Sequence, residues 1–147
     1  MSTAFSKVVS GVIAALAANP PVCPTKAIYR ARAVEMPDQD NEAVSVQWEQ
    51  GLPQLATITG APIDWQTRIT VECFARSAAV GATGDVVVDP LLQRVYERLA
   101  ADPSLGGLVD DLVIAGIEAE NTVEGKKTGW VRMTYLASHR TDNLTLS

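Results

Sequence analysis

The segment from Asp89 to Leu112, DPLLQRVYERLAADPSLGGLVDDL, constrains the fold most, because it joins a helix to a sharp turn and then to a strand. Asp89 can accept hydrogen bonds from the free N–H groups at a helix start, and Pro90 suits the first helical position. The pattern therefore predicts a helix that begins near Pro90. Pro103, the second proline of the segment, disfavours helical geometry at Asp102, so the helix should end by Ala101 or Asp102.

One face of this helix is predicted to be buried. Its apolar residues recur at spacings of four, three and four, which places them on a single stripe. The stripe consists of Val88, Leu92, Val95 and Leu99, and the opposite side carries Gln93, Arg94, Glu97 and Arg98. Gly106 and Gly107 then allow the chain to turn into a strand.

Length and composition favour one soluble globular domain over residues 1–147. Apolar residues make up 47% and charged residues 20% of the chain, which demands a packed core. The net charge of −5 argues against a protein that binds phosphate backbones, since such a surface is basic. Cys23 and Cys73 are too few for a disulfide framework, so we expect two free thiols in a reducing compartment.

The N-terminal residues predict a second helix, from about residue 3 to residue 18. On a helical wheel one sector collects Phe5, Val8, Val9, Val12, Ile13 and Leu16, and the opposite side holds Lys7, Ser10, Gly11 and Ala14. This is the pattern of a helix packed on a core, although a cleaved signal peptide is the alternative. The apolar run is too short to span a bilayer.

Alternation of apolar and polar residues predicts the strands. Their approximate ranges are 26–35, 44–48 with a stop at Gly51 and Pro53, a weaker 54–60, 64–77, 112–120 and 130–137. The last two form a β-hairpin with a long polar loop, and the tail 139–147 is expected to be loosely held. Segregated runs of helices and strands point to an α+β fold: a mainly antiparallel sheet, covered on one face by two helices, with an additional β-hairpin.

The longest predicted strand separates two kinds of face. Trp65, Ile69, Val71, Cys73 and Ala75 should face the core. The opposite face carries Gln66, Arg68, Thr70, Glu72 and Arg76, so it is either solvated or used for contact with another chain. Val44, Val46 and Trp48 form the predicted buried face of the preceding strand.

No catalytic, cofactor or metal site is predicted. His139 is the only histidine and lies in the final segment, where we expect it to be exposed or loosely packed. The acid pairs Asp110 with Asp111 and Glu118 with Glu120 have no suitably placed lysine for a metal-dependent nuclease. The glycines of SAAVGATGD match no phosphate-binding motif. We therefore predict that the chain is not an enzyme.

The run DPLLQRVYERLAADPSLGG, the following strand with Glu118 and Glu120, and the closing strand WVRMTYLA resemble the tail terminator, or tail completion, proteins of long-tailed bacteriophages. The resemblance covers most of residues 64–138. It implies a six-membered ring at the head-proximal end of the tail tube, which stops tube polymerisation and joins the head-completion protein. It also implies a location in the virion, assembly in the host cytoplasm, and DNA that passes through the lumen without specific binding.

Candidate contact residues follow from expected exposure. The subunit interface is assigned to the sheet face with Arg68, Glu72, Phe74 and Arg76, because oligomer contacts bury large apolar groups such as Phe74. Packing of Phe74 within the subunit is the equal alternative. Contacts with the tube or connector are assigned to two polar loops, which contain Asp38, Asp40 and Glu42, and Glu124, Lys126 and Lys127.

Other functions remain open at this point. A head-completion or tail-tube subunit of the same assembly would share the ring contacts. A small α+β enzyme or ligand-binding domain would instead require a concave pocket with convergent polar groups.

Overall fold

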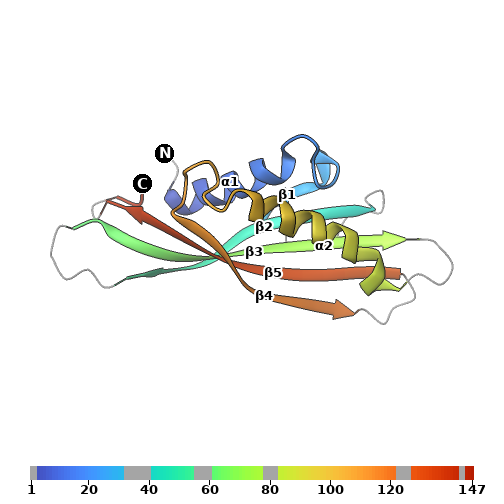
Figure 1. Cartoon of the computed structure of the whole chain (residues 1–147). Coiled ribbons are helices and arrows are strands. Elements are labelled where there is room, and N and C mark those ends of the chain that lie inside the picture. The colour runs from blue at the N-terminus through green and yellow to red at the C-terminus, as the bar shows by residue number, and fades with distance from the viewer. Residues whose placement is uncertain (1–2, 32–40, 55–60, 78–82, 122–126, 143–144) are drawn as a thin grey trace.

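Two helices lie on one face of a five-stranded sheet in the computed structural model of the chain, so the predicted α+β class is confirmed (Figure 1). The structure describes residues 3–31, 41–54, 61–77, 83–121, 127–142 and 145–147. The elements are α1 (Ala4–Ala17), a short 3-10 helix (Thr25–Ala27), β1 (Ile28–Arg30), β2 (Glu42–Pro53), β3 (Ile63–Ser77), α2 (Gly84–Ala101), β4 (Asp111–Asn121) and β5 (Lys127–Thr141).

The sheet has the strand order β1-β2-β3-β5-β4. β1 pairs with β2 in parallel, and the other three pairs are antiparallel. The longest ladder joins β3 to β5, from Ile63 opposite Thr141 to Ser77 opposite Lys127. β4 and β5 form the predicted hairpin, and both strands are longer than the sequence pattern indicated.

Helix α1 has the predicted position, and its predicted stripe is buried except at Ile13, which is half-buried. The Thr3 hydroxyl accepts a hydrogen bond from the Ser6 N–H at 3.3 Å, which satisfies one free donor at the helix start. The predicted solvent side is partly in contact with the rest of the chain. The Arg30 guanidinium donates to the Ser6 and Ser10 hydroxyls at 2.7 and 2.8 Å, and a Cβ on Gly11 would lie 2.6 Å from a Leu108 methyl.

Helix α2 begins earlier than predicted. It starts at Gly84 with Thr83 as N-cap, so Pro90 lies inside the helix and the predicted start near Asp89 is wrong. Pro90 is exposed, and the missing N–H of an interior proline removes only one helical hydrogen bond. The burial of Val88 on the core favours helix before the proline. The predicted end is confirmed at Ala101.

The buried stripe of α2 also differs from the prediction by one residue. Leu91 is fully buried, whereas Leu92 is half-buried at the side of the stripe. Val88, Val95 and Leu99 are buried as predicted. Successive helical residues are about 100° apart. A small rotation of the helix about its axis, which points Leu91 at the core, therefore turns Leu92 towards β4.

Two other boundaries differ from the sequence prediction, and a third prediction is not tested. The strand predicted over 26–35 has only three described strand residues, because Ala31 takes a positive φ of 50°. β2 does not stop at Gly51 but continues to Pro53, which is possible because Pro53 lies at an edge of the sheet where no donor is needed. The weaker strand predicted over 54–60 lies outside the described residues.

The chain end is held more firmly than predicted. β5 continues through His139 and Arg140 to Thr141, so the expectation of a loose tail from residue 139 is wrong for these residues. His139 is only 4% exposed, because β5 pairs with β3 along its whole length. Further on, the Leu146 carbonyl accepts a hydrogen bond from the Ala4 N–H at 2.5 Å, so the two ends of the chain meet.

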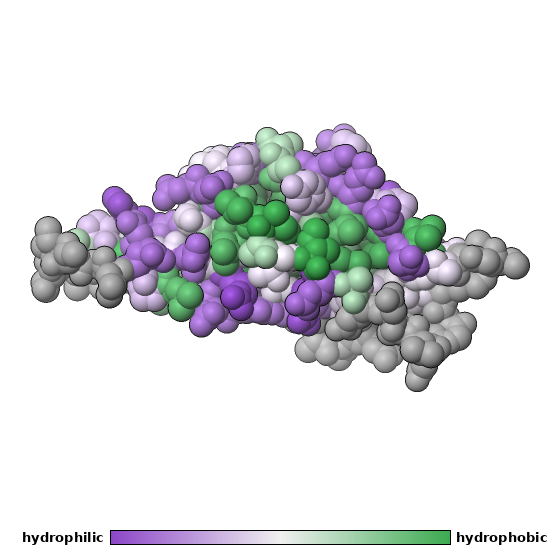
Figure 2. All heavy atoms as spheres, turned by 60° about the horizontal axis from the view of Figure 1, so that its bottom comes forward, coloured by the Kyte–Doolittle hydropathy of each residue, from purple (hydrophilic) through white to green (hydrophobic). Residues whose placement is uncertain are grey.

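The side of the molecule on which β4 lies carries an apolar patch. Figure 2 shows this side, with apolar side chains gathered in the middle and hydrophilic side chains around them.

Gly106 and Gly107, with φ of 74° and 94°, make the predicted turn that leads the chain from α2 into β4.

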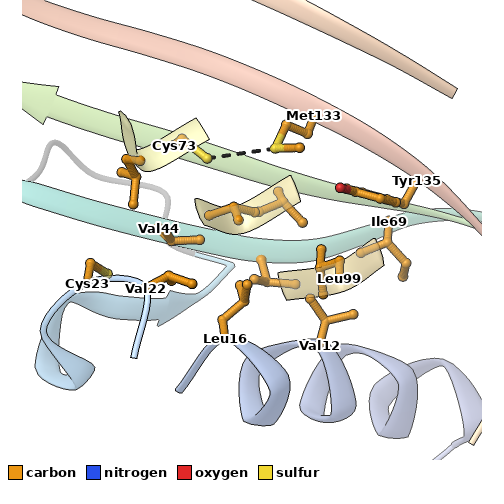
Figure 3. Packing of buried hydrophobic residues seen from close by; sticks show 14 of the residues in the cluster. Val12, Leu16, Val22, Cys23, Val44, Ile69, Cys73, Leu99, Met133 and Tyr135 are labelled. Carbon is orange, nitrogen blue, oxygen red and sulfur yellow. Dashed lines mark hydrogen bonds between the residues drawn. The ribbon is translucent and has the colours of Figure 1, made fainter. Parts of the chain in front are cut away.

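The core lies between the helices and the covered face of the sheet (Figure 3). Val12 and Leu16 of α1 and Leu99 of α2 pack against Ile69 and Tyr135 of the sheet. Neither cysteine forms a disulfide, as predicted. The Cys73 thiol lies 3.9 Å from the Met133 sulfur, and burial raises the pKa of Cys73 to about 12.

Arg98 connects the two helices. Its guanidinium extends from α2 and donates hydrogen bonds to the carbonyls of Ala15 and Ala18, both at 2.8 Å, and to the carbonyl of Pro20. These carbonyls belong to the end of α1 and the residues after it. The predicted solvent side of α2 therefore supplies a structural contact through Arg98.

Candidate functional site at the sheet edges

Phe74, predicted as an oligomer contact, packs within the subunit. Its ring is 7% exposed and meets the Trp130 ring edge-on at 5.9 Å between centroids. The Arg76 guanidinium lies over the same ring at 4.9 Å, a cation–π geometry. The alternative interpretation, packing within the subunit, is therefore correct, and the expectation of an open contact at Phe74 is wrong.

The other residues of that predicted interface differ in accessibility. Arg68 is exposed on the sheet face that the helices leave uncovered. Glu72 is half-buried and accepts a hydrogen bond from the Arg132 guanidinium at 3.3 Å. Of the four predicted interface residues, Arg68 alone is fully exposed.

The predicted tube contacts fall into two groups. Asp38, Asp40, Glu124 and Lys126 lie outside the described residues. Glu42 is not in a loop but is the first residue of β2, where its carboxylate forms an ion pair with Arg94 of α2. Lys127 likewise begins β5, opposite Ser77. The strands thus extend further into the predicted loops than the sequence indicated.

His139 is buried rather than exposed. Its Nε2 shares a hydrogen bond of 2.6 Å with the Thr67 hydroxyl, and its ring meets Phe5 edge-on at 5.4 Å. Burial lowers the pKa of His139, and Asp110 partly opposes that effect. Within the described residues no cluster of three metal-binding side chains occurs, and Asp111 and Glu118 lie far apart along β4. His139 thus has the surroundings of a structural residue.

A polar depression of about 430 Å³ lies at the end of the sheet near His139, between Gln54 and Asp110. Asp64 and Arg140 both line this depression, and the Arg140 guanidinium donates to both carboxylate oxygens of Asp64, at 2.7 and 3.3 Å. These hydrogen bonds lower the pKa of Asp64 and hold both charges in an internal pair. The charges of Asp64 and Arg140 are therefore satisfied by each other within the subunit.

β4 forms one edge of the sheet, and we call its outer side, from Leu112 to Ala119, the β4 edge. No described strand pairs with this side. Residues 115–119 are all exposed, and Val113 and Ile117 keep 49% and 50% of their surface in solvent. An unpaired strand with exposed apolar side chains can pair with another chain, and soluble proteins usually protect such an edge.

β2 supplies a second unpaired segment on the opposite side of the sheet. β1 pairs with β2 only from Val44 to Val46, so the outer side from Gln47 to Pro53 has no partner strand among the described residues; we call it the β2 edge. Trp48 and Leu52 are each 47% exposed there. Trp48 was predicted to be buried, but it is about half exposed, although the Phe5 ring stacks on its indole at 5.1 Å between centroids.

A groove of about 190 Å³ lies beside the β4 edge, between α2 and the β4–β5 hairpin. Val88 and Leu92 of α2 line one wall, and Ala119 and Val131 line the sheet side. Asp85 and Asp89 lie at its rim. A hydrogen bond with Thr83 lowers the pKa of Asp85, so this rim is anionic at neutral pH.

The comparisons with known proteins gave no match: neither the protein-family models nor the curated proteins contain one similar to this chain. Among the described helices, none is both long and apolar enough to cross a membrane. Interpretation of the two edges therefore depends on their geometry and on the sequence resemblance.

Sequence reasoning missed both edges because it assigned faces and not strand order. The alternation of Val44, Val46 and Trp48 does not reveal where the helix cover ends. A usable signal was present in β4, where Val113 and Ile117 occur in the same strand as Asp111 and Glu118. Charged residues on both sides of exposed apolar residues are typical of edge strands.

Proposed function

We propose that this chain is a structural protein of a long-tailed bacteriophage. It forms a six-membered ring at the head-proximal end of the tail tube, ends tube polymerisation and joins the tail to the head-completion protein. The ring size and the position in the virion come from the resemblance of residues 64–138 to tail terminators. Assembly takes place in the host cytoplasm.

The observation that carries this proposal is that two different edges, on opposite sides of one sheet, have no partner strand in the described part of the chain. A cyclic ring requires a heterologous contact, in which one surface of a subunit meets a different surface of the next. The β2 edge and the β4 edge are two such surfaces, and each exposes two large apolar residues. A chain that functions alone would be expected to cover them.

The charge of the chain agrees with a ring around passing DNA. The net charge is −5, so a lumen built from these subunits need not hold phosphate groups by attraction. Such a lumen lets DNA pass without specific binding.

Native mass spectrometry of the purified chain, combined with electron microscopy in the presence of tail tubes, tests the proposal. We expect six-fold rings and density at one end of each tube, with tube growth stopped when the chain is added. A chain that stays monomeric and ignores tube ends would contradict the proposal.

The same experiment separates the alternatives within the assembly. A tail-tube subunit would polymerise into long tubes without other components. A head-completion protein would bind the portal side and leave tube growth unchanged. A ligand-binding domain or an enzyme would show neither behaviour.

A further inference from the structure

The two edges match each other in their pattern of apolar residues. On the β2 edge, Trp48 and Leu52 are four residues apart, and on the β4 edge Val113 and Ile117 are also four residues apart. Side chains of a regular strand alternate between faces, so residues four apart normally share a face. Neither pair obeys this rule, because each strand contains an irregularity between the two residues.

The register shows which face each residue occupies. Trp48 lies opposite Ile69 and Ile117 lies opposite Met133, so both point to the face that the helices cover. Leu52 lies opposite Gln66, and Val113 lies opposite Leu136, so both point to the open face. Each edge thus presents one large apolar residue on each face of the sheet.

The strand directions permit the two edges to pair. β4 is antiparallel to β5, β5 to β3 and β3 to β2, so β4 is antiparallel to β2 within one subunit. When copies stand side by side around an axis, the β4 of one copy meets the β2 of the next with the same relative direction. The contact is then an antiparallel ladder that continues the sheet from subunit to subunit.

One register brings the apolar residues together on both faces. Placing Val113 opposite Leu52 also places Ile117 opposite Trp48, because both strands make the same change of face between these positions. A shift by an odd number of residues would set residues of opposite faces against each other.

The carboxylates select the same register. It sets Glu118 opposite Gln47 and Glu49 opposite Gly116, so that no two carboxylates face each other. A shift of two residues in one direction sets Glu118 opposite Glu49, and like charges at directly opposite positions destabilise a ladder. The same shift in the other direction sets Ile117 opposite Val46, whose outer side already pairs with β1, so Ile117 would lose its apolar partner on the β2 edge.

We infer that copies of this chain join by antiparallel pairing of the β4 edge with the β2 edge of the next copy, with Val113 opposite Leu52 and Ile117 opposite Trp48. This inference rests on the proposed ring and assigns its subunit contact. The groove between α2 and the hairpin lies on the same face as Ile117, and it offers an apolar wall close to the Trp48 indole of the neighbouring copy.

Cysteine cross-linking tests the register. Directly opposite residues of an antiparallel ladder have Cα atoms about 4.5–5.5 Å apart, which a disulfide can span. The two matched variants are Val113→Cys with Leu52→Cys, and Ile117→Cys with Trp48→Cys. The swapped combinations, Val113→Cys with Trp48→Cys and Ile117→Cys with Leu52→Cys, are controls that use the same four positions. Mild oxidation of the full chain, alone and with tail tubes, should give ladders of covalent multimers for the matched variants only.

A charge variant gives an independent measurement. A Cβ on Gly116 meets no atom within 4 Å, so Gly116→Glu can be accommodated in the subunit and places a second carboxylate opposite Glu49. We expect Gly116→Glu to weaken association by up to about fivefold per contact, and the added change Glu49→Lys to restore it. Gly116→Gln is the matched uncharged control and should associate more strongly than Gly116→Glu.

The outcomes distinguish this inference from the ring itself. Oligomers that form without matched cross-links, or that cross-link equally in the swapped variants, overturn the edge pairing and leave the ring standing. Failure of Glu49→Lys to restore association of Gly116→Glu also overturns the pairing. A chain that is monomeric under all conditions, including beside tube ends, overturns both.

Discussion

Strands β4 and β5 belong to one hairpin but have opposite relations to solvent. In β5 every second residue from Val131 to His139 is buried, whereas β4 is exposed at every residue from 115 to 119. The two strands are in register, with Ile117 directly opposite Met133 on the same face. Ile117 is half exposed and Met133 is fully buried.

The difference arises from the reach of helix α2. The helix packs on β3 and β5 and has few contacts with β4. Apolar residues beneath it stabilise the subunit, whereas apolar residues beyond it contribute little to folding. Hydrophobic residues at adjacent positions of one sheet can therefore differ in role. Met133 stabilises the subunit, whereas Ile117 is left accessible for contact with another copy.

The largest difference between the two strands should appear at their glycines. A Cβ on Gly129 of β5 would overlap the Gly84 carbonyl at the start of α2, while a Cβ on Gly116 of β4 would be unobstructed. We expect Gly129→Ala to lower the free energy of unfolding by about 4 kcal/mol. Gly116→Ala should leave it unchanged or raise it by up to about 1 kcal/mol. Urea unfolding of both variants measures this, and equal effects would refute the comparison.

The opposing pair Met133 and Ile117 gives the next largest contrast. Truncating a fully buried side chain removes apolar burial and leaves a cavity, so Met133→Ala should cost about 3 kcal/mol. Ile117→Ala should cost less than about 1 kcal/mol in the monomer, since half of the side chain already lies in water. Thermal or urea unfolding at a concentration where the chain is monomeric checks both values.

The end of β5 provides a pH-dependent contrast. Burial holds the pKa of His139 below its ordinary value of 6.5, so as pH falls below 6.5 the unfolded chain binds a proton that the folded chain resists. The free energy of unfolding should therefore decrease between pH 7.5 and pH 5.5. His139→Gln should reduce this decrease. The carboxyls of Asp64 and Asp85 have pKa values lowered from 3.8 and titrate below the window. An identical pH dependence in the variant would contradict the prediction.

The smallest effect on stability is expected for a charge on the β4 edge. Ile117→Asp should change the free energy of unfolding of the monomer by no more than about 1 kcal/mol, because the side chain is half exposed. It should nevertheless abolish assembly. Val86→Asp is the matched control on α2, since Val86 is 65% exposed and lies outside both edges. Sedimentation velocity should show oligomers for Val86→Asp and none for Ile117→Asp.

Much of the fold could be predicted because single elements have strong local patterns. The stripe of α1 and the alternation of β3 each fix which residues are buried, independently of the rest of the chain. The start of α2 could not be obtained in this way. Asp89 and Pro90 form a good local helix start. Val88, in the turn before Asp89, is buried on the core, and this burial outweighs the local preference, so the helix begins at Gly84.

The candidate site was less predictable because exposure depends on which strands are neighbours. Phe74 and Arg68 share one face of β3. Trp130 and Arg76 cover Phe74, whereas Arg68 is exposed. His139 looked loosely held because it is close to the chain end. The pairing of β5 with β3, between residues more than 70 positions apart, places it in the interior instead.

The contact of Arg98 with the end of α1 has a consequence for synthesis on the ribosome. No basic residue occurs in the last turn of α1, and its final carbonyls receive their hydrogen bonds from a side chain 80 or more positions later in the chain. Helix α1 leaves the exit tunnel before α2, so the hydrogen bonds at its C-terminal end are completed only after α2 has emerged. Until then its apolar stripe and its C-terminal end are both open to chaperones, so α1 is synthesised before α2 but is secured only together with it.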